Sequence, residues 1–185
     1  MNPQIGQTWF RVAISITTLD RKLARSMEPR AATPQRRLDA VRGLARAGIP
    51  VTVMFAPVVP GLNDHELETV LEQSAAAGAT GAGYVALRLP LEIKDLFREW
   101  LASDHPDRAS RVMSLVRQMR GGRDYDANWR TRMKGEGPIA DLLSRRFAAA
   151  RRRYGLDSPS PVLDLTRFHR PPASGDQGDL FAAAE

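Results

Sequence analysis

One segment of the sequence combines arginines with aromatic residues in a way that suits nucleic acid. Residues 121–134 contain Arg123, Tyr125, Trp129, Arg130 and Arg132. Guanidinium groups bind phosphates and aromatic rings stack on bases, so this mixture is typical of surfaces that bind single strands. A solvated loop packed by its own aromatic side chains has the same composition and is the more common case. The segment therefore leaves two interpretations, a nucleic-acid contact and an ordinary surface loop.

Arg88 stands at the end of an apolar run. A guanidinium at the carboxyl end of a buried strand needs a partner, and barrel enzymes bind their substrates at that rim. An ion pair with Glu92 or Asp95 explains Arg88 almost as well as a substrate contact. Asp20 and the Glu-Pro-Arg run at residues 28–30 follow another apolar run. They can orient a substrate, although helix capping is the more frequent use of such an aspartate.

Other kinds of catalytic site find little support in the composition. The chain has no cysteine, so it can hold neither a disulfide nor a zinc or iron–sulfur site with thiolate ligands. Its histidines, His65, His105 and His169, show no spacing typical of a metal site. The sequence contains no nucleophile elbow, phosphate-binding loop or dinucleotide fingerprint. We therefore expect no metal centre built by this chain alone.

The excess of positive charge comes almost entirely from arginine. The 185 residues include 27 Lys plus Arg and 21 Asp plus Glu, for a formal net charge of +6, and 43% of the residues are hydrophobic. Only Lys22, Lys94 and Lys134 are lysines, a bias that a GC-rich genome produces without any ligand. Residues 111–153 nevertheless hold twelve basic and four acidic side chains. The second half of the chain therefore carries a local positive field.

The overall composition is that of a globular domain large enough to bury a core. No stretch approaches the about 20 uninterrupted apolar residues that span a bilayer, and the polar first residues do not resemble a secretion signal. We therefore expect a cytoplasmic protein with no membrane partner.

The candidate side chains need a scaffold, and three short apolar runs rich in β-branched residues predict its strands. These runs are Val12–Thr17, Val51–Val58 and Gly83–Leu89. Each is apolar almost throughout instead of alternating, which is typical of a parallel sheet covered on both faces.

Helices are predicted between and after the strands. Thr33 as N-cap and Gly48 as terminator enclose one helix. Asn63 is the predicted N-cap of the next helix, with Glu66 bonding back to it in a variant of the capping box. Three more helices are predicted over residues 93–101, 108–119 and 139–154, with a loop over residues 121–137.

This alternation predicts an α/β fold with about three parallel strands. Such a sheet has two edges with unpaired backbone groups, and the first strand, at Ala13–Ile16, is too apolar for a solvated edge. Its neighbour is expected in a partner chain or in the missing front of a larger barrel. We divide the chain into βα units at residues 1–104, a helical basic element at residues 105–156 and a flexible tail at residues 157–185.

Six short stretches of the sequence occur in an order that matches a known pattern. They are Ile14–Asp20, Met27–Arg30, Ala47–Val51, Ala56–Asp64, Leu87–Pro90 and Met119–Tyr125. Together they resemble the C-terminal half of bacterial radical S-adenosylmethionine (radical SAM) proteins. The resemblance extends from about Val12 to Leu156 and is strongest to the DNA-repair-photolyase-like group related to spore photolyase. Several matches in the right order are far more specific than any one of them.

The resemblance implies a partial TIM-type β/α barrel, of which this chain would supply the last three strands and a helical C-terminal element. It also implies S-adenosylmethionine and a 4Fe–4S cluster as cofactors, with the cluster held by a three-cysteine loop after the first strand of the barrel. The sequence departs from the family there, because the cysteine loop and the glycine-rich strand after it are absent. A truncated gene, a split gene or a start codon assigned too late each account for this absence.

The resemblance also implies which residues face the cofactor. The candidates are Ser15, Thr17, Ala56, Pro57, Val58, Val85 and Leu87. The two hydroxyls alternate along the first strand, so both are expected to point into the barrel, toward the ribose or the methionine carboxylate. The second strand would form an apolar floor under adenine, and the backbone of the third strand would meet the edge of the ring. Ordinary buried strand residues are the alternative interpretation of each candidate.

We expect a truncated or split radical SAM protein that acts on nucleic acid and is inactive alone. Its partners would be nucleic acid and a chain that carries the cysteine-containing half of the barrel. In the tail, Gln177, Leu180 and Phe181 resemble peptides that bind the bacterial sliding clamp, although Gly178 replaces an anchoring leucine. The alternatives are a noncatalytic nucleic-acid-binding or adaptor protein that uses the arginine-rich loop and the tail, and a chain without retained function.

Overall fold

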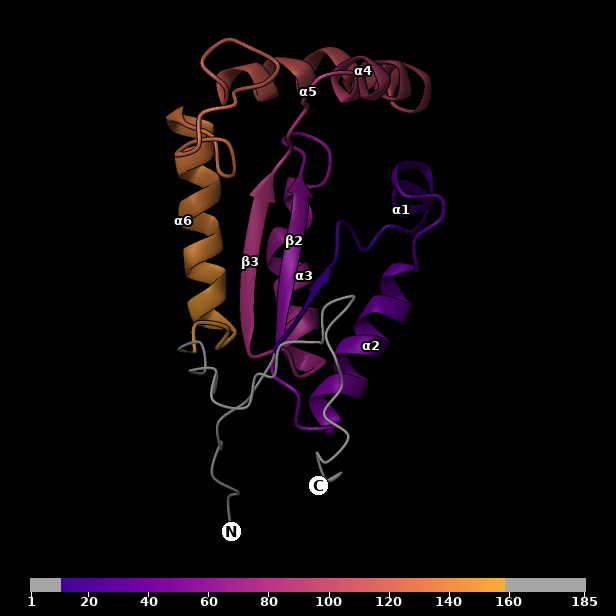
Figure 1. Cartoon of the computed structure of the whole chain (residues 1–185), viewed down its shortest axis with the longest axis vertical. Coiled ribbons are helices and arrows are strands. Elements are labelled where there is room, and N and C mark those ends of the chain that lie inside the picture. The colour runs from indigo at the N-terminus through magenta and orange to yellow at the C-terminus, as the bar shows by residue number, and fades with distance from the viewer. Residues whose placement is uncertain (1–10, 159–185) are drawn as a thin grey trace, which may run out of the picture. The chain divides into compact units, whose positions relative to one another are not determined.

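Three parallel strands form the centre of the computed structural model, which describes residues 11–158 (Figure 1). The strands are β1 (Val12–Ser15), β2 (Val51–Val58) and β3 (Gly81–Ala86), in the spatial order β1-β2-β3. Val12 pairs with Val51 and Thr52 pairs with Gly81, so the three carboxyl ends lie at the same end of the sheet. The predicted α/β fold with three parallel strands is confirmed.

Two strands differ in extent from the sequence prediction. β1 stops at Ser15, and at Thr17 the side chain takes over the contact with β2 by donating to the carbonyl of Ala56, 3.1 Å away. β3 begins at Gly81, earlier than predicted, because two glycines and an alanine open it and an apolar pattern does not register such small residues. It also ends at Ala86, after a register shift between Phe55 and Val58 of β2.

Helices α2 (Pro34–Arg46) and α3 (Leu67–Ala76) follow β1 and β2 and pack back against the sheet, with α3 behind the strands in Figure 1. The Thr33 side chain accepts the N–H of Arg36 and begins α2, as predicted. Gly48 ends the helix in a left-handed conformation, with φ of 74°. These two crossovers are the right length for parallel βα units.

Helix α6 (Gly137–Arg153) completes the third βα unit. It packs against β3 and α3 (Figure 1), and Leu143, Phe147 and Leu156 belong to the core beneath the sheet. The ring of Phe147 lies 4.7 Å, centre to centre, from the ring of Tyr84 on β3. The helix predicted as part of a separate C-terminal element therefore occupies the place of the helix that covers β3.

Three helices lie toward the carboxyl ends of the strands (Figure 1). They are α1 (Arg21–Met27), α4 (Ile93–Asp104) and α5 (Pro106–Gln118). Asp20 caps α1 by accepting the N–H of Lys22 at 2.7 Å, the more frequent of its two expected uses. Leu23, Leu101 and Val112 from the three helices share a second core. The predicted boundary at residue 104 falls between α4 and α5, inside this core.

The predicted capping box at Asn63 and Glu66 is wrong. The Asn63 side chain is fully buried and donates to the carbonyls of Thr17 and Pro57, at 2.7 and 3.0 Å. Glu66 accepts the hydroxyl of Thr18 at 2.6 Å, and a 3₁₀ turn, η1 (Asp64–Glu66), precedes α3. The residue types match a local cap, but both side chains instead tie the ends of β1 and β2 to the start of α3.

The sheet is covered by helices on one face, so the prediction of cover on both faces is wrong for the described residues. On β2, Val51, Val53 and Phe55 are fully buried in the core with the helices. The alternate residues of the three strands are half-buried or exposed and face the other way. We call this side the open face; its residues are Ala13, Ser15, Thr52, Met54, Ala56, Gly83 and Val85. Such a face is what a partial barrel leaves uncovered.

The two outer edges of the sheet differ in how many of their backbone groups are bonded to other described residues. Along β3, Ala86 donates its N–H to the carbonyl of Met133 at 2.8 Å, and Asp157 forms an antiparallel bridge with Gly81. Along β1, Val12 donates its N–H to the carbonyl of Pro50, just before β2, and Ile16 donates to Met54 on β2. The ladder alternation therefore turns the backbone groups of Ala13 and Ser15 outward. Of these, the Ser15 carbonyl accepts from Arg37 at 2.9 Å, and the outward N–H groups have no partner among the described residues. β1 is therefore the bare edge.

No helix within residues 11–158 has the length and apolar composition of a membrane span. The cytoplasmic location stays a prediction. The sliding-clamp residues Gln177, Leu180 and Phe181, and most of the proposed tail, lie outside the described residues. The division at residues 104 and 156 also stays a prediction.

Candidate functional site

The cofactor candidates divide between the open face and the core. Ser15, Ala56 and Val85 lie on the open face. Pro57, the residue after Ala56, is half-buried. Val58 and Leu87 are buried at 0% and 8% exposure and belong to the two hydrophobic cores. Contact of these residues with a cofactor stays a prediction. Among the candidates, the residues on the open face are the ones that a cofactor can reach.

Thr17 and Ser15 have different surroundings despite their alternate spacing. Ser15 is exposed, whereas Thr17 is 2% exposed. The Thr17 hydroxyl lies 3.0 Å from Glu28 Oε2 and 3.1 Å from the carbonyl of Ala56, and Arg37 also binds Glu28, at 2.8 Å. The Thr17 hydroxyl thus fixes the chain just after β1. The exposed Ser15 hydroxyl is the one of the two that a ligand can reach.

The backbone beyond β3 is occupied by the chain itself. Leu87 donates its N–H to the carbonyl of Val58 at 2.9 Å, and Ala86 donates to Met133. Arg120 donates to the carbonyls of Leu87 and Ala86, at 2.6 and 3.4 Å. Because these groups are already paired, they are not free for the edge of an adenine ring.

The residues present do not fit an iron–sulfur cluster. The sequence has no cysteine, and no group of three His, Asp or Glu side chains within residues 11–158 is arranged to hold a metal ion. The open face offers one exposed hydroxyl, Ser15, beside small or apolar side chains. At Gly83 an added Cβ would lie 2.6 Å from the sulfur of Met54, so Met54 lies flat against β3. This flat, mostly apolar surface suits an aromatic ring better than the charged end of S-adenosylmethionine.

Arg88 forms neither of the ion pairs considered from the sequence. Its Nη2 donates to the Tyr125 hydroxyl at 3.3 Å, and its Nη1 lies 3.9 Å from the Met133 sulfur. Asp95 pairs with Arg98 instead, at 3.6 Å. Within residues 11–158, no carboxylate lies within ion-pair distance of Arg88. An arginine held at the end of β3 by neutral partners keeps its charge available for an anion.

Arg120 is a central residue that the sequence analysis missed. It is 3% exposed and donates only to carbonyls, those of residues 86 and 87 and that of Thr131 at 3.0 Å. Burial lowers its pKa below the usual value; the charge of Asp126 opposes this shift, and the charge of Arg88 nearby adds to it. Arg120 lies in Met119–Tyr125, one of the stretches that resemble the radical SAM pattern. This resemblance was the only sequence feature that pointed to Arg120. Its buried charge makes the end of β3 positive.

The loop at residues 121–136 brings some of the predicted nucleic-acid residues together and leaves others apart. The Arg132 guanidinium carbon lies 3.5 Å from the centre of the Trp129 ring, and the next residue, Met133, contacts Arg88. Arg123 and Arg130 are exposed, and their side chains make no contact that joins them to this group. We define the rim cluster as Arg88, Arg120, Tyr125, Trp129 and Arg132.

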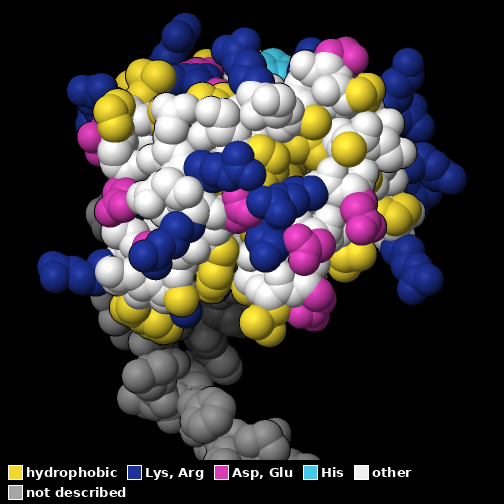
Figure 2. Space-filling model, turned by 90° about the horizontal axis from the view of Figure 1, so that it is seen from above, with side chains coloured by type: hydrophobic (Ala, Val, Ile, Leu, Met, Phe, Trp, Pro, Cys, Tyr) yellow, Lys and Arg dark blue, Asp and Glu magenta, His cyan; other side chains and the backbone are white. Residues whose placement is uncertain are grey.

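The rim cluster lies at the carboxyl end of the sheet, in a positive environment. Figure 2 looks onto this end and shows Lys and Arg side chains across the surface and around its margin, with Asp and Glu among them. Asp124 is already bound by Arg98 and by Arg117, the latter at 2.7 Å. Asp126 accepts the Thr131 hydroxyl and a backbone N–H, which lowers its pKa. The two aspartates of the loop are therefore engaged in contacts that hold it in place.

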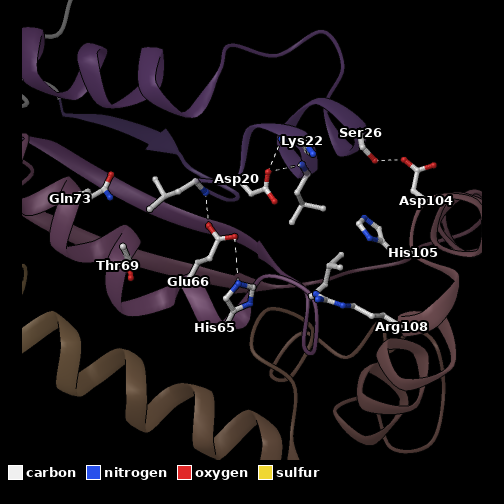
Figure 3. Close-up of a pocket in the computed structure, with 13 residues that line it drawn as sticks. Asp20, Lys22, Ser26, His65, Glu66, Thr69, Gln73, Asp104, His105 and Arg108 are labelled. Carbon is white, nitrogen blue, oxygen red and sulfur yellow. Dashed lines mark hydrogen bonds and ion pairs between the residues drawn. The ribbon is translucent and has the colours of Figure 1, made fainter.

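A cavity of about 890 Å³ lies elsewhere, between α1, the start of α3 and the junction of α4 and α5 (Figure 3). Asp20, His65, Glu66, His105 and Arg108 are among its lining residues. Its three carboxylates all have partners: Asp20 caps α1, Glu66 binds Thr18 and the backbone of residue 19, and Asp104 accepts the Ser26 hydroxyl. His65 and His105 come from different elements and do not form a metal site with the acids. The carboxylates of this cavity are therefore engaged in contacts within the fold.

Part of the chain matches a known family. The model of the Radical SAM superfamily matches residues 5–73. Within the described residues this range contains β1, α1, α2, β2, η1 and the start of α3. The radical SAM match thus lies on the half of the chain that carries the bare edge and most of the open face.

Two relatives extend the comparison. A protein of Mycobacterium tuberculosis, the uncharacterized protein Rv2578c, is 40% identical over 109 residues, which cover 58% of this chain and 32% of the relative. A protein of Acidianus two-tailed virus, ORF301, is 36% identical over 70 residues, which cover 35% of this chain and 23% of the relative. The chain thus spans about a third of the mycobacterial relative that it matches. No solved structure matches at a significant level.

Proposed function

We propose that this chain forms part of a radical SAM enzyme of the DNA-repair-photolyase-like group that acts on nucleic acid. In this proposal the cysteine-bearing part of the barrel comes from polypeptide outside these 185 residues and docks along β1. The superfamily match at residues 5–73, the length of the matched relative and the absence of cysteine support it.

The observation that carries the proposal is the asymmetry of the sheet edges. The chain's own residues cover β3 at both ends, through Met133 and Asp157. The β1 edge, with the apolar residues Val12, Ala13 and Ile14, leaves outward N–H groups without a partner in residues 11–158. An open, apolar edge of this kind is a template for another strand. A strand added there would continue the sheet and curve over the open face.

The chain's own share of such an enzyme is binding and orientation. The cofactor and its cluster would supply radical chemistry from the completing part, and no step of that chemistry is assigned to residues of this chain. Ser15, Ala56 and Val85 on the open face would contact the nucleoside side of the cofactor. The rim cluster would hold the substrate at the carboxyl end of the strands, where barrel enzymes bind their substrates.

A second candidate function is a noncatalytic nucleic-acid-binding protein. The observation that favours it is the stack of Arg132 on Trp129, 3.5 Å from the ring centre, which needs no cofactor. Both candidates share the nucleic-acid contact and differ in whether β1 receives another part of a barrel.

The test is co-expression with a tagged cysteine-bearing protein encoded upstream in frame or in the adjacent reading frame. We expect the two polypeptides to co-purify and, after anaerobic addition of iron and sulfide, to bind a cluster. Ala13→Pro removes an outward N–H from β1 without touching a bond to β2, so it should abolish co-purification and leave the circular dichroism spectrum unchanged.

The matched control is Ala13→Ser, which changes the side chain at the same position and keeps the outward N–H of β1. This variant should co-purify as the parent chain does. The proposal fails if no such reading frame encodes a three-cysteine loop, or if Ala13→Pro co-purifies as well as the parent. The nucleic-acid-binding candidate would then stand alone.

A further inference from the structure

The three arginines of the rim cluster hold more positive charge than the carboxylates near them offset. Within residues 11–158, neither Arg88 nor Arg120 nor Arg132 has a carboxylate within ion-pair distance. The neighbouring Asp124 is bound by two other arginines. Asp126 accepts from Thr131 and a backbone N–H, and its charge acts on Arg120 from beyond ion-pair distance. A concentration of guanidinium groups whose acidic neighbours are engaged elsewhere attracts an anion.

Two of these guanidinium groups are also short of hydrogen-bond acceptors. The Nε atoms of Arg88 and Arg132 are buried and have no partner among the described residues. The acceptors that Arg88 does have are weak ones, a hydroxyl at 3.3 Å and a sulfur at 3.9 Å. A buried N–H without a partner costs free energy. The oxygens of a phosphate group match the fork of an arginine and would satisfy the Nη donors that remain.

Trp129 adds a surface for stacking next to these charges. Its side chain is 76% exposed, although one face of the ring is covered by Arg132. An exposed indole is unfavourable in water, and the guanidinium fixes the plane of this one. The free face is of the right size and chemistry for a nucleobase.

We propose that Arg88, Arg132 and Trp129 form a subsite for one nucleotide of single-stranded nucleic acid. The phosphate binds the two arginines over the buried charge of Arg120, and the base stacks on Trp129. A duplex buries the faces of its bases, so the stack requires an unpaired base. The inference rests on the nucleic-acid part of the proposed function and does not depend on completion of the barrel.

The test measures binding of a fluorescein-labelled 12-nucleotide single strand of mixed sequence to the full chain by anisotropy, at several salt concentrations. Trp129→Leu should weaken binding by about 5-fold to 100-fold, the range for one stacked base, with an unchanged salt slope. Arg88→Gln and Arg132→Gln should each weaken it by about 10-fold and reduce the salt slope by about one. The same sequence as a blunt duplex should bind at least about 10-fold more weakly than the single strand.

The matched controls are Arg123→Gln and Arg130→Gln. They remove the same charge from the same loop, at exposed positions outside the rim cluster, and should change the affinity by less than about 3-fold. Equal losses from all four arginine variants, or equal binding of duplex and single strand, would overturn the subsite. Arg88→Lys keeps the positive charge and removes the planar, forked set of guanidinium donors. For each variant, a thermal unfolding curve like that of the parent shows that the fold is intact.

The outcome is separable from that of the proposed function. If no oligonucleotide binds, both the subsite and the nucleic-acid part of the proposal are wrong, while co-purification with the cysteine-bearing part still decides the barrel. If the variants behave as expected and no cysteine-bearing part exists, the subsite belongs to a binding protein.

Discussion

Arg120 connects the loop at residues 121–136 to the end of β3. Its guanidinium reaches the carbonyl of Thr131 in the loop and those of Ala86 and Leu87 after the strand. Hydrogen bonds from a charged donor are stronger than neutral ones, and loss of the donor leaves carbonyls without a partner in a buried site. One side chain therefore fixes the position of Trp129 and Arg132 relative to Arg88.

At the residue scale, Arg120→Met should destabilise the chain by about 2–3 kcal/mol, because it removes charged hydrogen bonds and strands buried acceptors. Urea unfolding followed by circular dichroism measures the change, and limited proteolysis should cut the loop faster. Arg123→Met, at an exposed position three residues away, should stay within about 0.5 kcal/mol of the parent. Equal stability of the two variants would contradict a structural role for Arg120.

Between elements, α6 is fixed to α3 by one arginine. Arg146 on α6 donates to Glu68 on α3 at 2.7 and 2.9 Å, and to the carbonyl of Asp64 at 2.9 Å. The hydrogen bond from Arg146 lowers the pKa of Glu68 below its usual value and raises that of Arg146. Because α6 is the helix that covers β3, this pair helps to close the third βα unit.

At the element scale, this pair should give a pH-dependent share of the stability. The folded-state pKa of Glu68 is lowered, so the contribution is present above the unfolded pKa, about 4.3, and is lost as the pH falls through the folded value. Both side chains are part-exposed, so we expect less than about 1 kcal/mol. Urea unfolding of Glu68→Gln should show this deficit at pH 7 and none at pH 3.

Glu72→Gln is the matched control for that experiment, since Glu72 lies on α3 and is exposed. It should follow the parent at both pH values. A deficit of Glu68→Gln that persists unchanged at pH 3 would show that packing, and not the charge of Glu68, is what the substitution removes.

At the scale of the whole molecule, the decisive property is that residues 11–158 cover one edge of the sheet and leave the other bare. Met133 precedes α6 and Asp157 follows it, and both bond to the outer edge of β3. At the β1 edge, the carbonyl of Ser15 is the one outward group that residues 11–158 engage, through Arg37. Within this part of the chain, the sheet is therefore open to continued growth on the β1 side.

At this scale, amide hydrogen exchange should report the bare edge directly. The N–H groups of Ala13 and Ser15 should exchange orders of magnitude faster than that of Ile16, which donates to Met54 at 2.9 Å. Assembly with a cysteine-bearing part should slow the exchange of Ala13 and Ser15 and leave Ile16 unchanged. Equal protection of the three amides in the chain alone would mean that the β1 edge is already covered.

The sequence by itself determined the elements and their order. Apolar runs, the cap at Thr33 and the left-handed Gly48 are local signals, because each depends on residues within one or two turns of the chain. They located the three strands, most helix positions and the loop at residues 121–137. The missing cysteines and the missing neighbour of β1 were also evident, since both are properties of composition and of apolar character.

Only the tertiary structure decided which side chains meet. The Asn63 amide bonds to Thr17, far away in sequence, and Arg120 and Arg88 meet at the end of β3, so no local pattern contains these contacts. The same holds for α6, which returns to the sheet only after the insertion of α4 and α5. Long-range pairing depends on the shape of the folded chain, and residue types within a window do not encode it.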